Sequence, residues 1–218
     1  MQISVFAQKA RRVLASRWLL LPLAVLALGL ISGFWLIRPP AAGNIAHDYA
    51  SLEALREHWR QGDLIILVRH AERCDRSSAP CLSAPDGITV RAQVAAHELG
   101  ERFRVLGVAD ADIYSSPQVR AEQTAASMFG QQPAQQNWLY DCRGSMLRQA
   151  QQHKVAHRNL ILVTHSECIE DLEATVSIAE PATPDYASSL FLINDGQGAP
   201  KLLGYLDADQ WAAVAPIR

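Results

Sequence analysis

The first 40 of the 218 residues contain no aspartate or glutamate, which sets them apart from the rest of the chain. Only 15 of the 20 basic residues lie in the remainder, together with all 22 acidic ones, so that part carries a net charge of about −7. It lacks the basic face that nucleic acids require, and we expect no nucleic-acid partner. Internal repeats and low-complexity tracts are absent too, and 49% hydrophobic residues argue against disorder.

Residues 18–37 contain no charged residue either, and this stretch is long enough to cross a membrane. Its 20 residues would span about 30 Å as a helix, the thickness of a bilayer core. Trp18 and Trp35 lie near its ends, where membrane interfaces favour aromatic residues. Four basic residues precede the stretch and one follows it, so the positive-inside rule keeps the N-terminus in the cytoplasm. A signal peptide cut near Ala41 is the alternative.

These features predict a single-pass protein of the bacterial inner membrane with its folded domain in the periplasm. We expect a basic cytoplasmic N-terminus over residues 1–17, a transmembrane signal anchor over 18–37, a linker over 38–47 and one domain over 48–218. A domain of roughly 170 residues is large enough to bury a core of its own. If the apolar segment is cleaved, the domain is periplasmic without an anchor.

The four cysteines include no short C-x-x-C pair, which argues against a zinc site, and we expect no metal. Their even number, all outside the apolar segment, favours disulfide bonds in an oxidising compartment. Cys74 and Cys81 bracket a Ser/Pro loop, which indicates a local disulfide, and Cys142 and Cys168 would then pair across the fold. Four reduced, buried thiols are the alternative, which a cytoplasmic protein would favour.

Apolar runs alternate with amphipathic segments along the domain, a pattern typical of an α/β sheet covered on both faces. The runs 63–69 and 159–164 are continuously apolar, as buried strands are. We expect a three-layer α/β/α sandwich with a mostly parallel sheet. The other predicted strands are 111–115, 138–140, 190–194 and 201–205, and the predicted helices are 48–61, 89–106, 117–129, 145–155 and 167–176.

Polar side chains follow three of these strands directly. Arg69 ends the first strand and His70 follows it, Ser116 and then Arg120 follow the second, and His165 follows the second continuously apolar run. Such sheets bind ligands at the carboxyl ends of their strands. Arginine offers a planar fork of donors that fits phosphate oxygens, and a neutral imidazole nitrogen can attack phosphorus. Each residue alone could have a packing or surface role, but together they predict a phosphoryl-transfer site.

Three segments resemble the motifs of the histidine-phosphatase (phosphoglycerate mutase-like) superfamily. Residues 67–72 (LVRHAE) resemble its opening R-H-G/A-E motif, residues 116–125 (SPQVRAEQTA) its S-x-x-x-R-A-x-x-T-A motif, and residues 163–166 (VTHS) the motif with the late histidine. They occur in the family's order, which makes the joint signal strong. The resemblance implies a phosphoglycerate mutase-like fold and a phosphomonoesterase that needs no cofactor.

A narrower resemblance lies in residues 69–76 (RHAERCDR) and 87–90 (GITV), together with Cys81-Leu-Ser. These segments are similar to the periplasmic Ais-type lipopolysaccharide core heptose(II)-phosphate phosphatases, which also carry an N-terminal hydrophobic segment. The likeness is close over residues 66–120 and looser beyond. It implies a phosphorylated sugar of the lipopolysaccharide core as substrate.

Under this resemblance His70 is the nucleophile, and Arg69, Arg120 and His165 hold the phosphoryl oxygens. The superfamily often places its proton donor in an L-x-E segment. Here that place is taken by Leu139-Tyr-Asp141, so Asp141 is the expected acid. The alternatives are Glu72, Glu167 or no defined acid at all, as in some relatives, in which case Asp141 could be a turn residue.

Four further residues are expected to contact substrate: Arg73, Arg76, Ser116 and Glu72. Arg73 and Arg76 could hold a second anionic group or be solvated loop charges. Ser116 could donate to phosphate or shape the turn before Pro117, and Glu72 could orient its loop or pair with Arg73. The cysteines are not expected to be nucleophiles, because the Cys-x5-Arg loop of cysteine phosphatases is absent.

Two other functions are compatible with these residues. The first is a phosphatase for another exported phosphoester or for a phosphohistidine protein. The second is a membrane-tethered binding or sensor domain that keeps the phosphate pocket but has lost turnover. The pairs of histidines and arginines favour the enzyme, and the uncertain acid leaves the binding domain open.

Overall fold

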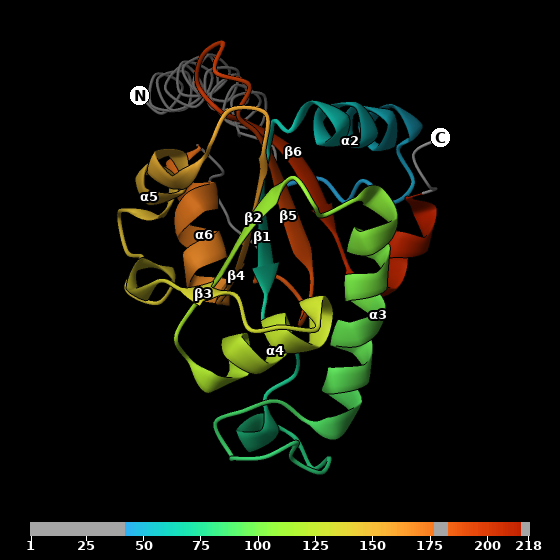
Figure 1. Cartoon of the computed structure of the whole chain (residues 1–218), viewed down its shortest axis with the longest axis vertical. Helices are drawn as coiled ribbons and strands as arrows, with labels where there is room; N and C mark the ends of the chain where they lie inside the picture. Colours follow the sequence, from blue (N-terminus) through green and yellow to red (C-terminus); the bar gives the residue numbers. More distant parts are fainter. Residues whose placement is uncertain (1–41, 177–182, 215–218) are drawn as a thin grey trace, which may run out of the picture. The chain divides into compact units, whose positions relative to one another are not determined.

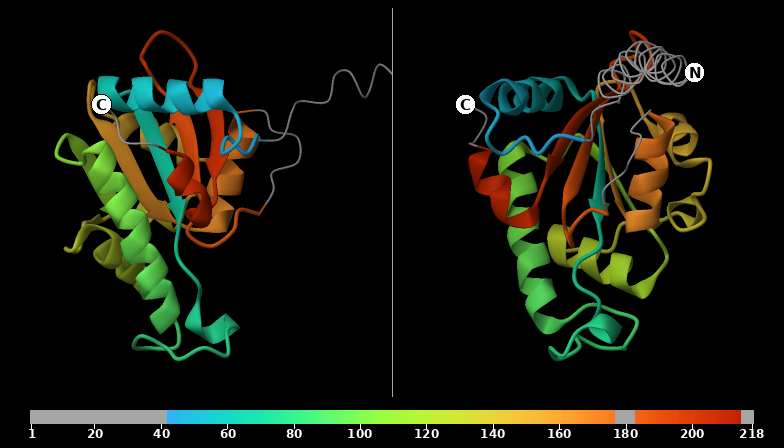
Figure 2. Two further views of the ribbon diagram at one scale, coloured as in Figure 1. Left: turned by 90° about the vertical axis from the view of Figure 1, so that its right-hand side faces the viewer. Right: turned by 180° about the vertical axis from the view of Figure 1, so that it is seen from behind.

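The computed structural model describes residues 42–176 and 183–214, which form a six-stranded sheet with helices on both faces (Figures 1 and 2). The strand order is β3-β2-β4-β1-β5-β6. All pairs from β3 to β1 are parallel, whereas β5 is antiparallel to both of its neighbours, so the sheet is mixed but mostly parallel. The strands are β1 (Leu64–Arg69), β2 (Ala111–Ser115), β3 (Ala134–Gln135), β4 (Asn159–Thr164), β5 (Ser189–Ile193) and β6 (Lys201–Leu206).

The helices form the two outer layers of the predicted sandwich. One face is covered by α2 (Tyr49–Gln61), α3 (Val90–Leu106), α4 (Val119–Phe129) and the 3-10 helix η3 (Ala208–Ala213), and the other by α5 (Met146–His153) and α6 (Ser166–Thr175). Two further 3-10 helices, η1 (Cys74–Arg76) and η2 (Asn137–Leu139), lie in connecting segments.

Strand β1 shows why the central strands read as continuous apolar runs. Leu64, Ile66 and Val68 pack into the core under α2, α3 and α4, and Ile65 and Leu67 pack into the core under α5 and α6. All five side chains have no exposed surface. Side chains of a strand alternate between the two faces of the sheet, so a strand that is covered on both faces has no polar position.

Capping residues fix the ends of the predicted helices. Asp48 accepts a hydrogen bond from the backbone N–H of Ala50 at the start of α2, and Thr89 accepts one from Ala92 at the start of α3. Gly62 ends α2 with φ of +74°, and a Cβ there would meet the backbone of His157 at 2.2 Å. The chain therefore requires glycine at this turn.

The prediction of a strand over residues 138–140 is wrong, because that segment contains η2. The edge strand β3 comes earlier and makes only two residue pairs with β2. After it, the N–H groups of Leu139 and Tyr140 bond to the nearby carbonyls of Gln136 and Asn137, which leaves them no sheet partner. Similarly, α4 begins at Val119 rather than at Pro117, since Ser116 and Pro117 shape the turn before it.

Both expected disulfides are present. Cys74 pairs with Cys81, with Cα atoms 5.2 Å apart, and Cys142 pairs with Cys168, with Cα atoms 5.5 Å apart. Ile45, within the predicted linker, is buried in the core. The predicted membrane segment, residues 18–37, lies outside the described residues, and none of the described helices is long and apolar enough to span a bilayer.

Candidate active site

The polar residues predicted at strand ends meet at one edge of the sheet. In the register, Arg69 of β1 lies opposite Thr164 of β4, and β2 and β4 also run in parallel. His70 donates its backbone N–H to the carbonyl of Thr164 at 2.9 Å, and Ser116 donates its own to Val163 at 2.9 Å. The three residues after the strands, His70, Ser116 and His165, therefore lie side by side because their strands are neighbours.

The His70 imidazole is oriented so that Nδ1 carries the proton and Nε2 carries a lone pair. Its side chain is almost wholly buried, at 3% exposure. Its Nδ1 lies 2.8 Å from the carbonyl oxygen of Ala71, which can only accept, so Nδ1 carries the proton. The Nε2 lone pair accepts a hydrogen bond from Arg120 Nε at 3.2 Å. Burial, helped by the positive charges around it, lowers the pKa of His70 to about 3, so the ring is neutral near pH 7.

His165 stands beside His70 with its ring nearly edge-on and the ring centroids 5.2 Å apart. Its Nε2 is 2.8 Å from Ser116 Oγ, while the buried Nδ1 has no partner among the described residues. Burial and then Arg120 lower the pKa of His165 to about 4. His165 also occupies the N-cap position of α6, and Arg120 lies in the first turn of α4, so two helix N-termini add positive potential to the site.

Arg69 supplies a second guanidinium, which is held by the segment that precedes β5. Its Nη1 donates to the carbonyl of Pro184, and its guanidinium carbon lies 4.1 Å from the ring centre of Tyr186. Burial lowers the pKa of Arg69 from its ordinary value, but arginine remains charged. Arg69 Nε is buried without a partner among the described residues. Unpaired donors in a cationic cluster are what an anion can satisfy.

A cavity of about 500 Å³ opens next to these residues, and two of the three candidate acids line it. Asp141 and Glu167 share its wall with Arg120 and His165. Burial by itself would raise the pKa of Glu167, but hydrogen bonds from its own backbone N–H and from Ser166, with nearby positive charges, lower the pKa overall. Asp141 is exposed on the turn that follows η2.

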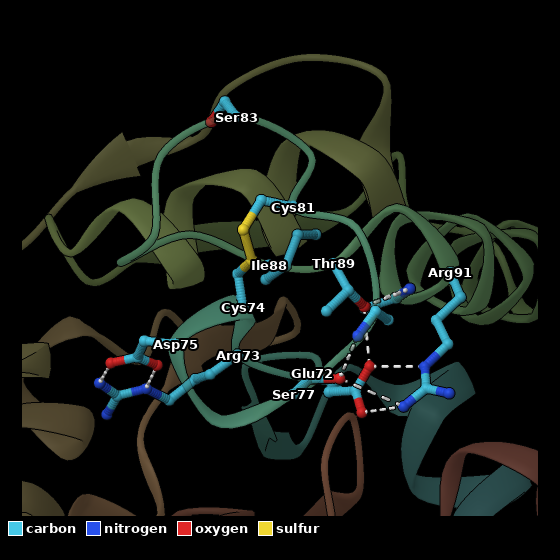
Figure 3. The surroundings of a disulfide bond; sticks show 12 residues. Glu72, Arg73, Cys74, Asp75, Ser77, Cys81, Ser83, Ile88, Thr89 and Arg91 are labelled. Atoms are coloured by element: carbon cyan, nitrogen blue, oxygen red, sulfur yellow. Dashed lines mark hydrogen bonds and ion pairs between the residues drawn. A yellow bond between two sulfur atoms is a disulfide. The ribbon is translucent and has the colours of Figure 1, made fainter.

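The third candidate acid, Glu72, is engaged elsewhere. It accepts hydrogen bonds from Arg91 Nε at 2.7 Å and from Thr89 Oγ1 at 2.8 Å, which lower the pKa of Glu72 to about 2 (Figure 3). It therefore stays ionised near pH 7 and cannot donate a proton there. The suggested pairing of Glu72 with Arg73 is wrong, because Arg73 Nε donates to Asp75 at 2.8 Å.

The two loop arginines expected at the rim lie close enough to act on the site. Burial lowers the pKa of Arg120, and the charge of Arg73 adds to that shift. Arg76 has the same effect on Arg69, where burial is again the larger cause. A neighbouring positive charge lowers the pKa of an arginine because it repels the charged form, and this effect is weak where water screens it fully. The charge of Arg73 is offset by its pair with Asp75, so Arg76 is the loop arginine that adds to the positive field beside Arg69.

The sequence analysis missed two residues that hold this cluster together. Thr124 Oγ1 accepts from the backbone N–H of Ala71 at 2.9 Å and donates to the carbonyl of Arg120 at 2.7 Å, so it ties the His70 segment to α4. Thr124 is the threonine of the second motif and could have been chosen on that ground. Tyr186, which packs against Arg69 and lies 5.8 Å from the His70 ring, had no signal in the sequence.

Curated relatives of this chain share one name. The lipopolysaccharide core heptose(II)-phosphate phosphatase of Escherichia coli O139:H28 (strain E24377A / ETEC) is 34% identical over 136 residues, which are 61% of this chain and 67% of that protein. The protein of the same name from Shigella sonnei (strain Ss046) is similar to the same extent. No family model matches the chain.

Solved structures of low sequence identity share the fold. A phosphoserine phosphatase mutant from Entamoeba histolytica in complex with phosphoserine has a TM-score of 0.52 at 16% identity, covering 67% of this chain and 98% of that one. The protein histidine phosphatase SixA complexed with tungstate has a TM-score of 0.51 at 14% identity, covering 67% and 97%. The α/β architecture described above is therefore the one found in phosphoglycerate mutase-like histidine phosphatases.

Proposed function

This chain belongs to the lipopolysaccharide core heptose(II)-phosphate phosphatase family of the histidine-phosphatase superfamily, and on that premise we propose that it hydrolyses a phosphate monoester on a heptose of the lipopolysaccharide core. The reaction passes through a phosphohistidine on His70. The substrate is suggested by the name of relatives that are 34% identical, and the chemistry by the geometry of the site.

The observation that carries the mechanism is the state of His70. Its Nδ1 proton is committed to the Ala71 carbonyl, and burial keeps the ring neutral, so Nε2 presents a lone pair at the carboxyl edge of the sheet. Arg120 touches that same nitrogen. A nucleophile next to a fixed cation is what attack on an anionic phosphoryl group requires.

In the first step, His70 Nε2 attacks phosphorus in line and the bond from phosphorus to the sugar oxygen breaks. Its electron pair goes to the leaving oxygen, which takes the proton of Asp141. The new N–P bond makes the ring cationic, and the Ala71 carbonyl stabilises its Nδ1–H. Arg69, Arg120 and His165 stabilise the charge on the phosphoryl oxygens.

In the second step, water attacks phosphorus and gives its proton to the Asp141 carboxylate as the N–P bond breaks. Inorganic phosphate leaves and His70 is neutral again. Asp141 thereby returns to its acid form, and the cycle is balanced in protons. The wall position of Asp141 beside Arg120 and His165 supports this role, and Glu167 in the same wall is its rival.

We also propose that the domain works in the periplasm, tethered to the inner membrane by residues 18–37. The charge-free stretch behind a basic N-terminus supports the anchor, and the two disulfides support an oxidising compartment. Protease added to spheroplasts should digest the domain while the membrane holds the N-terminus. A domain that is digested only after lysis would overturn the location, and a free domain would indicate cleavage.

The decisive experiment measures phosphate release by the full chain in detergent with a chelator present. The substrates are phosphorylated lipopolysaccharide core oligosaccharide and p-nitrophenyl phosphate. We expect His70→Ala to abolish turnover and His97→Ala, an exposed histidine on α3, to retain it. Quenching in alkaline detergent, in which the acid-labile N–P bond survives, should trap a phosphoenzyme whose label is lost in His70→Ala.

Each outcome of that experiment discriminates between the functions. Turnover that prefers the core oligosaccharide and depends on His70 supports the proposal. Equal activity on unrelated phosphoesters points to another exported substrate. Phosphate binding without turnover indicates a sensor domain, and activity that is unaffected by His70→Ala contradicts the mechanism.

A further inference from the structure

One wall of the 500 Å³ cavity is a short turn, residues 139–146, that joins η2 to α5. It begins at buried Leu139 and ends at buried Met146, and between them it exposes Tyr140, Asp141 and Arg143. These three side chains line the cavity together with His165, Arg120 and Glu167. The cavity therefore connects His165 and Arg120 to a turn that the mechanism uses only through Asp141.

Several interactions fix the backbone of the 139–146 turn. Cys142 is bonded to Cys168 of α6, and the disulfide is buried. The carbonyl of Leu139 accepts a hydrogen bond from Thr164 Oγ1 at 2.7 Å, inside the core. The Asp171 carboxylate accepts from the N–H of Gly144 at 2.6 Å and of Met146 at 3.2 Å. A turn fixed at both ends and in the middle presents its outward side chains in one geometry, which favours binding.

The exposed side chains of the turn are unlike ordinary surface residues. Tyr140 is 55% exposed although it is a large aromatic residue, and its ring lies edge-on to His165 with centroids 5.7 Å apart. Arg143 makes no ion pair within the part of the chain that the structure describes. The domain is acidic, so an arginine that faces a cavity without an acidic partner favours an anion from outside.

The size of the cavity fits more than the reacting phosphate. A volume of 500 Å³ lies within the range of about 300–1,000 Å³ that small-molecule sites occupy. The neutral imidazole of His70 and the cations Arg69 and Arg120 account for the phosphoryl end. The remaining wall offers the ring of Tyr140, which matches the apolar face of a sugar, and the guanidinium of Arg143, which matches an anionic substituent.

We propose that the 139–146 turn binds the leaving sugar, with Tyr140 packed on the sugar ring and Arg143 paired with a second anionic group carried by the same oligosaccharide. The second group is a phosphate or a carboxylate. This inference rests on the proposed function for the position of the reacting phosphate, and it adds the rule that substrates with two anionic groups are preferred. Arg143 is then a residue of specificity, while His70 remains the nucleophile.

The test compares the full chain on core oligosaccharide carrying one phosphate or two. We expect Arg143→Ala to lower the ratio of kcat/KM for the doubly over the singly phosphorylated substrate by about tenfold to a hundredfold, the usual loss of a charge-assisted hydrogen bond. Arg143→Lys should restore part of the ratio, because it keeps charge but loses the planar fork. Arg148→Ala, an exposed arginine of α5 close by in sequence, is the matched control.

A ratio that Arg143→Ala leaves unchanged would overturn the inference, and so would an equal loss in Arg148→Ala. Tyr140→Ala should raise KM for both oligosaccharides more than Tyr140→Phe does, since packing on the sugar needs the ring and not its hydroxyl. If Tyr140→Ala and Tyr140→Phe raise KM equally, the Tyr140 ring does not pack on the sugar. If Arg143→Ala leaves the substrate ratio unchanged and weakens only the binding of the protein to anionic lipid vesicles, Arg143 contacts the membrane surface and the inference is wrong.

The failure of this inference can be separated from failure of the proposed function. Calorimetry can measure binding of the doubly phosphorylated oligosaccharide to His70→Ala, with and without Arg143→Ala. If turnover is absent in the native chain but Arg143→Ala still weakens this binding, the function fails and the subsite stands. If turnover is present and binding is indifferent to Arg143, the subsite fails alone.

Discussion

Two disulfide-bonded segments border the carboxyl edge of the sheet, and they are held in different ways. The Cys74–Cys81 bond joins residues seven apart and ties the loop after β1 to itself, whereas Cys142–Cys168 joins residues 26 apart and ties the 139–146 turn to α6. The first loop extends beyond the end of β1 (Figure 2). A local bond shapes a loop without fixing where it lies, and a bond to a core helix fixes both.

The other contacts of the two segments differ in the same way. The loop after β1 carries exposed ion pairs: Glu72 pairs with Arg91, whose side chain is 68% exposed, and Arg73 pairs with Asp75 (Figure 3). Its later part is also held by Ile88, which is buried and donates its N–H to Gln123 of α4. The 139–146 turn depends on a buried hydrogen bond from Thr164 and on the caps from Asp171. Surface ion pairs stabilise little, so we expect the charged start of the loop, residues 72–77, to be less fixed than the turn.

The largest effect is expected on kcat, when the carboxylate of the 139–146 turn, Asp141, is compared with that of the loop after β1, Glu72. Asp141→Asn should lower kcat on a sugar phosphate by about 10²–10⁴-fold, the usual contribution of a general acid. Glu72→Gln should cost much less, because its carboxylate is already ionised by Arg91. The loss in Asp141→Asn should shrink on p-nitrophenyl phosphate, whose leaving group needs no proton. If Glu167→Gln shows this dependence on the leaving group and Asp141→Asn does not, Glu167 is the acid.

Removing each disulfide should sharpen the same comparison. Loop-closure entropy predicts a loss of unfolding free energy of about 3.5 kcal/mol when Cys142 and Cys168 are both replaced by alanine, and of about 2.4 kcal/mol for Cys74 and Cys81. Urea unfolding of the oxidised proteins measures both values. Equal losses would show that the turn gains nothing from its link to α6.

Between the two segments, the buried histidines should make stability depend on pH. The folded-state pKa values of His70 and His165, about 3 and about 4, lie below the ordinary value, so the unfolded chain binds protons first as pH falls. Unfolding free energy should therefore drop below pH 6.5, by roughly 2 kcal/mol per histidine at pH 5. Imidazole NMR should show neither ring titrating between pH 5 and 8, while both titrate in urea. A folded-state midpoint near pH 6.5 would contradict the neutral nucleophile.

The smallest effect should come from the side chains that anchor each segment. Asp171→Ala removes the acceptor for two backbone N–H groups of the turn and should cost about 1 kcal/mol of unfolding free energy, as lost helix caps do. Arg91→Ala should cost less, because its pair with Glu72 is screened by water. Thermal unfolding at low and high salt separates them, since only the ion pair should weaken with salt. A greater loss in Arg91→Ala would reverse the ranking of the two segments.

Much of the fold could be predicted because the relevant signals are local. Continuous apolar runs identified β1 and β4, alternation of elements indicated the layers, and the predicted helices 48–61 and 89–106 agree with α2 and α3. The prediction of a strand over 138–140 is wrong because Trp138 and Leu139 lie in the 3-10 helix η2. Strand pairing depends on neighbouring strands, which a few residues of sequence do not reveal. Cysteine number and spacing favoured the two disulfide pairs that the structure contains, but left reduced thiols as an alternative.

The sequence by itself determined that His70, His165, Arg69 and Arg120 lie at or shortly after the carboxyl ends of strands, which a parallel sheet brings to one edge. Only the tertiary structure decided how they work. The Ala71 carbonyl selects the tautomer of His70, and burial sets its charge. The partner of Glu72 and the place of Arg143 on a fixed cavity wall depend in the same way on contacts between segments distant in the chain. Composition and spacing record which groups are present, whereas hydrogen-bond direction and desolvation arise only when those groups are packed together.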